Sequence, residues 1–174
     1  MLGSGDYHTE DGKALFRSLG DSAPDRWGRM LMSRAAKRAA GAKGDAPRFL
    51  REIDYLLGVH DYARQGALRF AMERDGPFLA QSEGMTVPPL VELPRLLAAA
   101  DSVADDKNDD IRFLLAPGSS LGGARPKASV MDRDGTLAIA KFPKRDDSGD
   151  MVTWESVALT MAEKAGIFVQ GWRK

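Results

Sequence analysis

The sequence predicts an α+β protein in which a mainly helical segment precedes an antiparallel sheet with packed helices. Apolar residues recur at helical spacing in the first hundred residues, most clearly over 47–57. Later, Asp134-Gly135 separates two short apolar runs, and this dipeptide is a strong hairpin signal because both residues tolerate the positive φ of a two-residue turn. Helices that come first and strands that follow are typical of the α+β class.

The N-terminal half predicts helices with clear start and stop signals. Residues 1–13 are polar and glycine-rich, so we expect a flexible N-terminus. The stretch Asp21-Ser22-Ala23-Pro24 combines capping residues with a proline suited to the first helical turn. The helix it starts should end at Gly41. Its expected buried face consists of Trp27, Met30, Leu31 and Ala35.

The next elements follow from periodicity and turn residues. A second helix is expected over 47–57 and should end at Gly58. Strands are expected over 67–72 and 78–80, around an Asp75-Gly76 turn. A leucine- and alanine-rich helix should then cover 93–103.

The C-terminal part predicts the sheet and a final helix. We expect antiparallel strands within 112–142, joined at the Asp134-Gly135 turn. A helix over 152–165, capped near Asp150 or Thr153, should pack on this sheet, and a last strand is expected over 167–169. The helix residues expected to contact the sheet are Trp154, Ala158 and Met161.

Composition excludes several classes of protein. The 25 basic and 25 acidic side chains cancel, so no bulk charge attracts nucleic acid. The absence of cysteine excludes disulfides and thiolate metal sites, and we expect no metal site in this chain. No apolar run approaches the ~20 residues that span a bilayer, and the N-terminus lacks the apolar core of a signal peptide. We therefore expect a cytoplasmic protein without a membrane partner.

The small residues of the Gly118–Lys127 loop could bind an anion. They leave backbone N–H groups uncrowded, as in glycine-rich loops around phosphates. The spacing matches neither a Walker A loop nor G-x-G-x-x-G, so a flexible turn before a hairpin remains an equal alternative on glycine content. A lysine, Lys141, ends the second strand of the hairpin. A phosphate-covering loop followed by a strand lysine is the layout of a protein-kinase nucleotide site.

The strings SSLGGARPKA and LAIAKFP resemble the glycine-rich loop and lysine strand of HipA-like serine/threonine kinases. These kinases are the toxins of type II HipBA toxin–antitoxin pairs. The resemblance continues through WESVALTMAEKAGI, LGDSAPDRWGR and LLGVHDYARQGALRF, and so covers nearly the whole chain. It implies a helical and β-containing N-terminal HipA-like segment over 14–110. Residues 111–174 would hold the glycine-rich loop, the lysine strand and the αC-like helix of a kinase N-terminal lobe.

The resemblance implies that this lobe binds ATP. The expected contacts are Ser119, Ser120, Leu121, Gly122, Gly123, Ala124, Lys127, Lys141 and Glu155. Lys141 would reach the phosphates and Glu155 would hold it, although a strand-end lysine in solvent and an acid in a first helical turn are the simpler alternatives. Ser120 aligns with the family's autophosphorylation position; it could instead be a turn serine bonded to its own backbone. Arg125 departs from better-known relatives, in which an uncharged polar residue is common.

The catalytic groups of a kinase are not in this chain. Residues 156–174 contain no aspartate or asparagine, so the catalytic base and the Mg²⁺ ligands are expected in a missing C-terminal lobe, and the chain alone should be inactive. The resemblance further implies a HipB-like helix-turn-helix antitoxin as partner, DNA contact only through that antitoxin, and an aminoacyl-tRNA synthetase as substrate. The alternative is a non-catalytic interaction module that binds an antitoxin or a regulatory partner.

Overall fold

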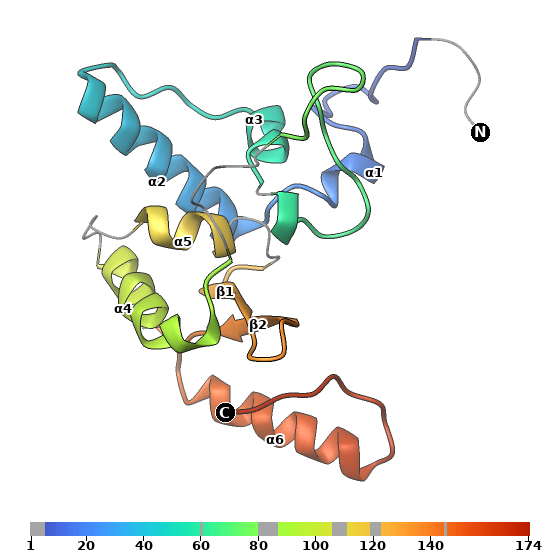
Figure 1. The fold of residues 1–174 in the computed structure, drawn as a ribbon, viewed down its shortest axis with the longest axis vertical. Coiled ribbons are helices and arrows are strands. Elements are labelled where there is room, and N and C mark those ends of the chain that lie inside the picture. Colours follow the sequence, from blue (N-terminus) through green and yellow to red (C-terminus); the bar gives the residue numbers. More distant parts are fainter. Residues whose placement is uncertain (1–5, 60, 80–86, 106–110, 119–122, 145) are drawn as a thin grey trace.

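The computed structural model describes residues 6–59, 61–79, 87–105, 111–118, 123–144 and 146–174. In this part of the chain, helices accompany a two-stranded antiparallel sheet, so the α+β prediction is confirmed (Figure 1). The helices are α1 (Arg17–Gly20), α2 (Arg26–Lys43), α3 (Glu52–Leu57), α4 (Leu93–Ala104), α5 (Ile111–Gly118) and α6 (Met151–Lys164). The strands are β1 (Lys127–Met131) and β2 (Leu137–Lys141), and short 3₁₀ turns cover Asp61–Ala63 and Leu90–Glu92.

Helix α2 begins at Arg26, just after the predicted capping stretch, and its N-cap residue Asp25 makes no side-chain cap hydrogen bond. Two residues of its predicted face are buried, and Met30 and Ala35 are half-buried. Trp27 and Leu31 lie in the core. The helix runs past Gly41 and ends at Gly44, whose φ of 74° is the left-handed conformation that glycine adopts without strain. The predicted stop at Gly41 is therefore one helical turn early.

Helix α3 is shorter than the predicted 47–57 helix. The Asp54 carboxylate accepts the Arg51 backbone N–H at 2.7 Å, and this cap fixes the helix start after Arg51. Leu56 is buried as expected, but Phe49 lies before the helix and is 92% exposed. Periodicity detected the buried turn, whereas a side-chain cap decided its start.

The segment 67–79 is an irregular loop, and the strands predicted there are wrong over these described residues. The turn is present, with Asp75 at a φ of 62°. A single backbone hydrogen bond, from the Leu79 N–H to the Phe70 carbonyl at 2.7 Å, joins the two described sides of the loop. Side chains hold the loop instead. Arg69 pairs with Asp61 at 3.0 Å, and the buried Arg64 stacks on the Phe70 ring at 4.7 Å.

The core lies between α2, α4, α5 and β1. Helix α4 matches its prediction closely, but residues 111–118 form helix α5, where a strand was expected. A helix forms here rather than a strand because it places Ile111 and Leu114, one turn apart, in the core against neighbouring helices. The buried set comprises Trp27, Leu31, Leu96, Ala99, Ala100, Val103, Ile111, Leu114, Ala128, Val130 and Phe142.

The hairpin forms as predicted. Its register runs from Lys127 opposite Lys141 to Met131 opposite Leu137. In the turn, Gly135 has a φ of 80° and the Asp134 carboxylate accepts the Thr136 N–H at 2.9 Å. The alternate residues of β2 that include Leu137 and Ile139 point away from the core and are exposed.

Helix α6 forms as predicted but does not pack on the sheet through its apolar stripe. Its cap is Asp150, which accepts the Thr153 N–H at 2.9 Å. Trp154 and Met161 are each 66% exposed and Ala158 is exposed as well, so the predicted sheet contact is wrong. Residues 167–169 are not a strand. Within the ranges that the structure describes, no helix combines the length and the apolar character needed to cross a membrane.

Candidate functional site

Two lysines face each other at the open end of the hairpin. Lys127 and Lys141 are cross-strand partners, and directly opposite residues of an antiparallel pair share one face. Burial and the neighbouring Lys141 ammonium lower the pKa of Lys127, while the Asp25 and Glu155 carboxylates oppose this shift. The site is thus a cluster of cations and carboxylates rather than a single charge.

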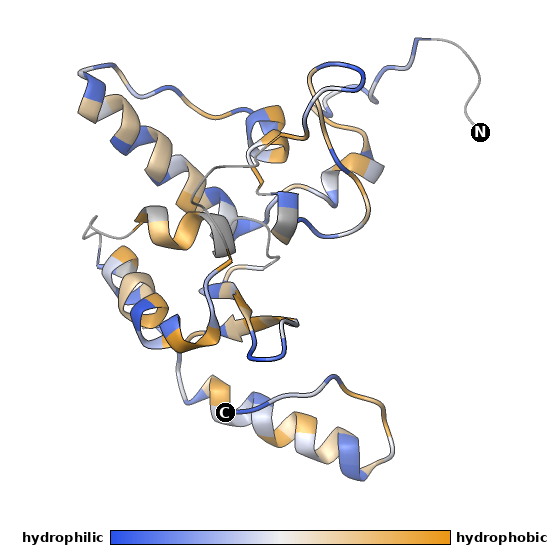
Figure 2. Ribbon diagram, in the orientation of Figure 1, coloured by the Kyte–Doolittle hydropathy of each residue, from blue (hydrophilic) through white to orange (hydrophobic). Residues whose placement is uncertain are grey.

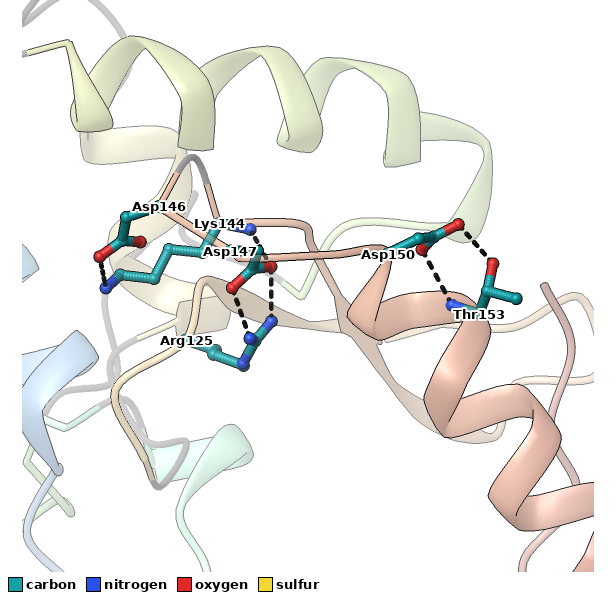
Figure 3. Close-up of polar contacts among 6 residues, drawn as sticks. All are labelled: Arg125, Lys144, Asp146, Asp147, Asp150 and Thr153. Carbon is teal, nitrogen blue, oxygen red and sulfur yellow. Dashed lines mark hydrogen bonds and ion pairs between the residues drawn. The ribbon is translucent and has the colours of Figure 1, made fainter.

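Lys141 forms an ion pair with Glu155, joining its Nζ to a carboxylate oxygen from the second turn of α6. Asp150 and Thr153 fix the start of α6 and therefore the position of Glu155 (Figure 3). The two side chains are 51% and 45% exposed. An ion pair with this exposure contributes little to stability, so its geometry orients the lysine more than it holds the fold together.

The loop before β1 is anchored to the start of α2. Gly123 N–H donates to an Asp25 carboxylate oxygen at 2.7 Å, and the Gly123 carbonyl accepts the Trp27 N–H at 3.1 Å. The Trp27 indole N–H donates to the Lys127 carbonyl at 3.0 Å. Gly123 has a φ of 87°, and a Cβ there would lie 2.8 Å from the Lys127 ammonium nitrogen. Glycine is favoured at this position because a φ of 87° strains any residue with a Cβ, whereas the flexible end of the Lys127 side chain could move away.

Arg125 is held by a carboxylate from the segment between β2 and α6. Its two terminal nitrogens donate to the two oxygens of Asp147 at 2.8 and 2.5 Å (Figure 3). The Lys144 backbone N–H donates to the same carboxylate at 3.0 Å. The Arg125 guanidinium, followed by the Lys144 amide, lowers the pKa of Asp147. This pair ties the start of the hairpin to the connection that leads into α6.

A pocket of about 350 Å³ opens between these elements. Arg125, Lys141 and Glu155 provide its charged side. Its remaining lining is apolar and consists of Phe142, Met151, Val152 and Trp154. A pocket lined by two cations, one carboxylate, and aromatic and aliphatic side chains suits an anionic compound that carries an apolar ring.

The family model for the HipA-like C-terminal domain matches residues 119–173. This segment is HipA-like. The HipA-like segment contains both strands, α6 and all the residues that line the pocket, so the resemblance seen in the sequence is confirmed over this range. The comparisons with curated proteins and with solved structures found no match.

The structure brings together part of the predicted site of the HipA-like segment. Lys141 and Glu155 meet, and Lys127 lies beside Gly123. Ala124 is exposed next to them. Ser119, Ser120, Leu121 and Gly122 lie outside the described residues, so phosphorylation of Ser120 stays a prediction.

Sequence reasoning missed Asp25 and Asp147. Asp25 precedes Gly123 by 98 positions, and no local pattern connects the two. Asp25 and Trp27 do lie within LGDSAPDRWGR, one of the stretches that carries the family resemblance. That stretch was the available signal, because a string that carries the family resemblance lies at a predicted helix start.

Proposed function

We propose that this chain is the N-terminal part of a HipA-like protein serine/threonine kinase and that its pocket binds the phosphates of ATP. The observation that carries the proposal is the Lys141–Glu155 ion pair, which lines the pocket within the HipA-like segment. A strand lysine held by a glutamate of the next helix is the arrangement by which protein kinases contact the α- and β-phosphates.

The charges of the pocket suit a nucleotide phosphate. Lys141 and Arg125 line it, and Lys127 lies close enough for the Lys141 charge to lower its pKa. Each cation has a carboxylate neighbour, so the site carries little net charge without a ligand, and binding a phosphate relies on directed contacts from the held cations rather than on net positive charge. The apolar wall with Trp154 offers a surface for the base. The Mg²⁺ that accompanies ATP is assigned by the resemblance to residues of a further lobe.

The role of the whole protein follows from the resemblance alone. We infer a cytoplasmic toxin whose partner is a HipB-like helix-turn-helix antitoxin and whose protein substrate is an aminoacyl-tRNA synthetase. Phosphoryl transfer needs a catalytic aspartate and Mg²⁺ ligands, which the resemblance places in a C-terminal lobe. This chain supplies the phosphate-binding side of that reaction.

Titration calorimetry of the 174-residue chain with ATP, with and without Mg²⁺, tests the proposal. Lys141→Met should weaken ATP binding by roughly tenfold or more, because it removes a charge-assisted contact. Glu155→Ala should act in the same direction more weakly, since it frees the lysine without removing it. Lys164→Met removes a lysine from the last turn of α6, the helix that carries Glu155, and is the matched control. This variant should bind ATP as the wild type does. Wild-type protein that binds no ATP, or equal affinity for Lys141→Met, would overturn the proposal.

A second candidate function is an interaction module, and the exposed apolar side of α6 favours it. Trp154, Val157 and Met161 are all exposed along the helix, and Ile167 and Phe168 follow in the tail. Figure 2 shows apolar stretches, in orange, along α6. Contiguous exposed apolar surface is typical of a protein contact. Binding of a helix-turn-helix antitoxin that Met161→Ser weakens, in a chain that shows no heat signal with ATP, would favour this second function.

A further inference from the structure

Arg125 lines the same pocket as Lys141. The two cations approach the pocket from different elements. Arg125 comes from the chain that enters β1, whereas Lys141 ends β2. Lys127 lies near both, since the positive charges of Lys141 and Arg125 each contribute to lowering its pKa. The pocket is therefore lined by two cations that come from different elements.

The Asp147 pair fixes the direction of the Arg125 guanidinium. Each terminal nitrogen of Arg125 gives one N–H to Asp147, at 2.8 and 2.5 Å (Figure 3). A guanidinium has five N–H donors in one plane, so this pair leaves three for another acceptor. Because the fork is rigid and planar, holding one edge also aims the other.

Asp147 is itself firmly placed. Its side chain is 12% exposed, and the Lys144 backbone N–H donates to it at 3.0 Å. The carboxylate is thus fixed by the chain between β2 and α6, whereas the Arg125 side chain is 39% exposed. The exposed partner is the cation, which is the one that an anionic ligand would contact.

We propose that Arg125 is a second phosphate-binding residue of this pocket, positioned by Asp147, and that it makes the site selective for nucleoside di- and triphosphates over monophosphates. This inference rests on the proposed ATP-binding function. Lys141 acts as a point charge on one phosphate, and the planar fork of Arg125 suits two oxygens of the next. A monophosphate can engage one of these cations, while a polyphosphate can engage both.

Titration calorimetry with ATP, ADP, AMP and inorganic tripolyphosphate tests the inference on the 174-residue chain. Arg125→Gln should weaken ATP, ADP and tripolyphosphate binding by roughly tenfold or more and AMP binding by about threefold or less. Arg125→Lys should recover only part of the loss, because a lysine keeps the charge but not the fork. Arg133→Gln, at the closed end of the hairpin, is the matched control and should leave all four affinities unchanged.

A double variant separates a phosphate contact from simple charge balance. Arg125→Gln alone leaves the Asp147 carboxylate uncompensated, and that charge would repel any anion. Arg125→Gln combined with Asp147→Asn removes both charges. The double variant should still bind ATP about tenfold more weakly than the wild type if Arg125 contacts phosphate. Affinity restored to the wild-type value would overturn the inference. A far-ultraviolet circular dichroism spectrum that matches the wild type shows that each variant is folded.

The outcomes distinguish this inference from the proposed function. ATP binding that depends on Lys141 but not on Arg125 overturns the inference and leaves the proposed function standing. If the chain binds tripolyphosphate but not ATP, and Arg125→Gln weakens that binding, the result supports a contact between Arg125 and phosphate. It contradicts the proposal that the ligand is a nucleotide. Equal losses for AMP and ATP overturn the selectivity, and wild-type protein that binds none of the four ligands overturns both proposals.

Discussion

The two ends of the described structure are held together by different forces. The N-terminal end packs α2, α4, α5 and β1 around a buried apolar core. At the C-terminal end, α6 and the segments before and after it contact the hairpin and its entry through polar links, while the apolar stripe of α6 stays exposed. These links are Lys141–Glu155, Arg125–Asp147 and Arg173–Asp132. Figure 1 shows α6 set apart from the other helices.

This difference matters for the site, because the pocket lies where the two kinds of contact meet. Phe142 belongs both to the core and to the pocket lining, whereas Glu155 and Trp154 come from α6. Apolar packing has no charge that salt could screen or pH could titrate, whereas exposed ion pairs are sensitive to both. The hairpin is therefore the fixed wall of the pocket, and α6 is the wall whose position depends on charge.

The largest expected effect is in the core. Leu31→Ala should lower the free energy of unfolding by about 2–5 kcal/mol, because it removes a fully buried side chain between α2 and its neighbours and leaves a cavity. Urea unfolding followed by circular dichroism at 222 nm measures the change. Ala39→Gly on the same helix, at an exposed position, should cost only the ~1 kcal/mol of helix propensity. A Leu31→Ala cost no greater than that of the control would contradict the proposed core.

The sequence predicts best those elements whose determining residues are close neighbours in the chain. The hairpin was predictable because Asp134 and Gly135 determine their own turn. Helix α6 was predictable for the same reason, since its cap lies three residues from the N–H that it accepts. The Lys141–Glu155 pair came from the family resemblance, which relates elements that no local pattern connects.

The remaining elements depend on neighbours that the sequence does not reveal. The run at 111–116 is too short for periodicity to separate helix from strand, and the packing of Ile111 and Leu114 decided it. The stripe on α6 has the spacing of a buried face, yet Trp154 is exposed because nothing described in the structure covers it. Periodicity predicts which residues share a face, but not what that face contacts.

A smaller effect is expected at the Arg125–Asp147 pair, and it depends on pH. The Arg125 guanidinium holds the pKa of Asp147 below its ordinary value of about 3.9. A carboxylate with a lowered folded-state pKa stabilises the fold above its unfolded pKa, and this contribution is lost as the pH falls through the folded value. Asp147→Asn should therefore be less stable than the wild type at pH 7, and the difference should shrink below about pH 4.

Thermal unfolding of the two proteins at pH 7, 5 and 3 measures this difference. The difference in melting temperature between the wild type and Asp147→Asn should also shrink in 1 M salt, because the Arg125 side chain is partly exposed and its charge is screened. A difference in melting temperature that stays constant from pH 7 to pH 3 would show that Asp147 acts through its shape rather than its charge.

The smallest effect is expected on the apolar stripe of α6. Met161→Ala removes a side chain that is already 66% exposed, and alanine is the better helix former, so the free energy of unfolding should change by no more than about 0.5 kcal/mol. Leu31→Ala removes a side chain of similar size but should lower the free energy of unfolding several times more. The ratio of the two losses directly compares the buried core with the exposed stripe of α6. A loss above about 2 kcal/mol for Met161→Ala would mean that the stripe is buried in solution. In that case α6 would be held by apolar packing, and the position of Glu155 beside Lys141 would no longer depend on charge.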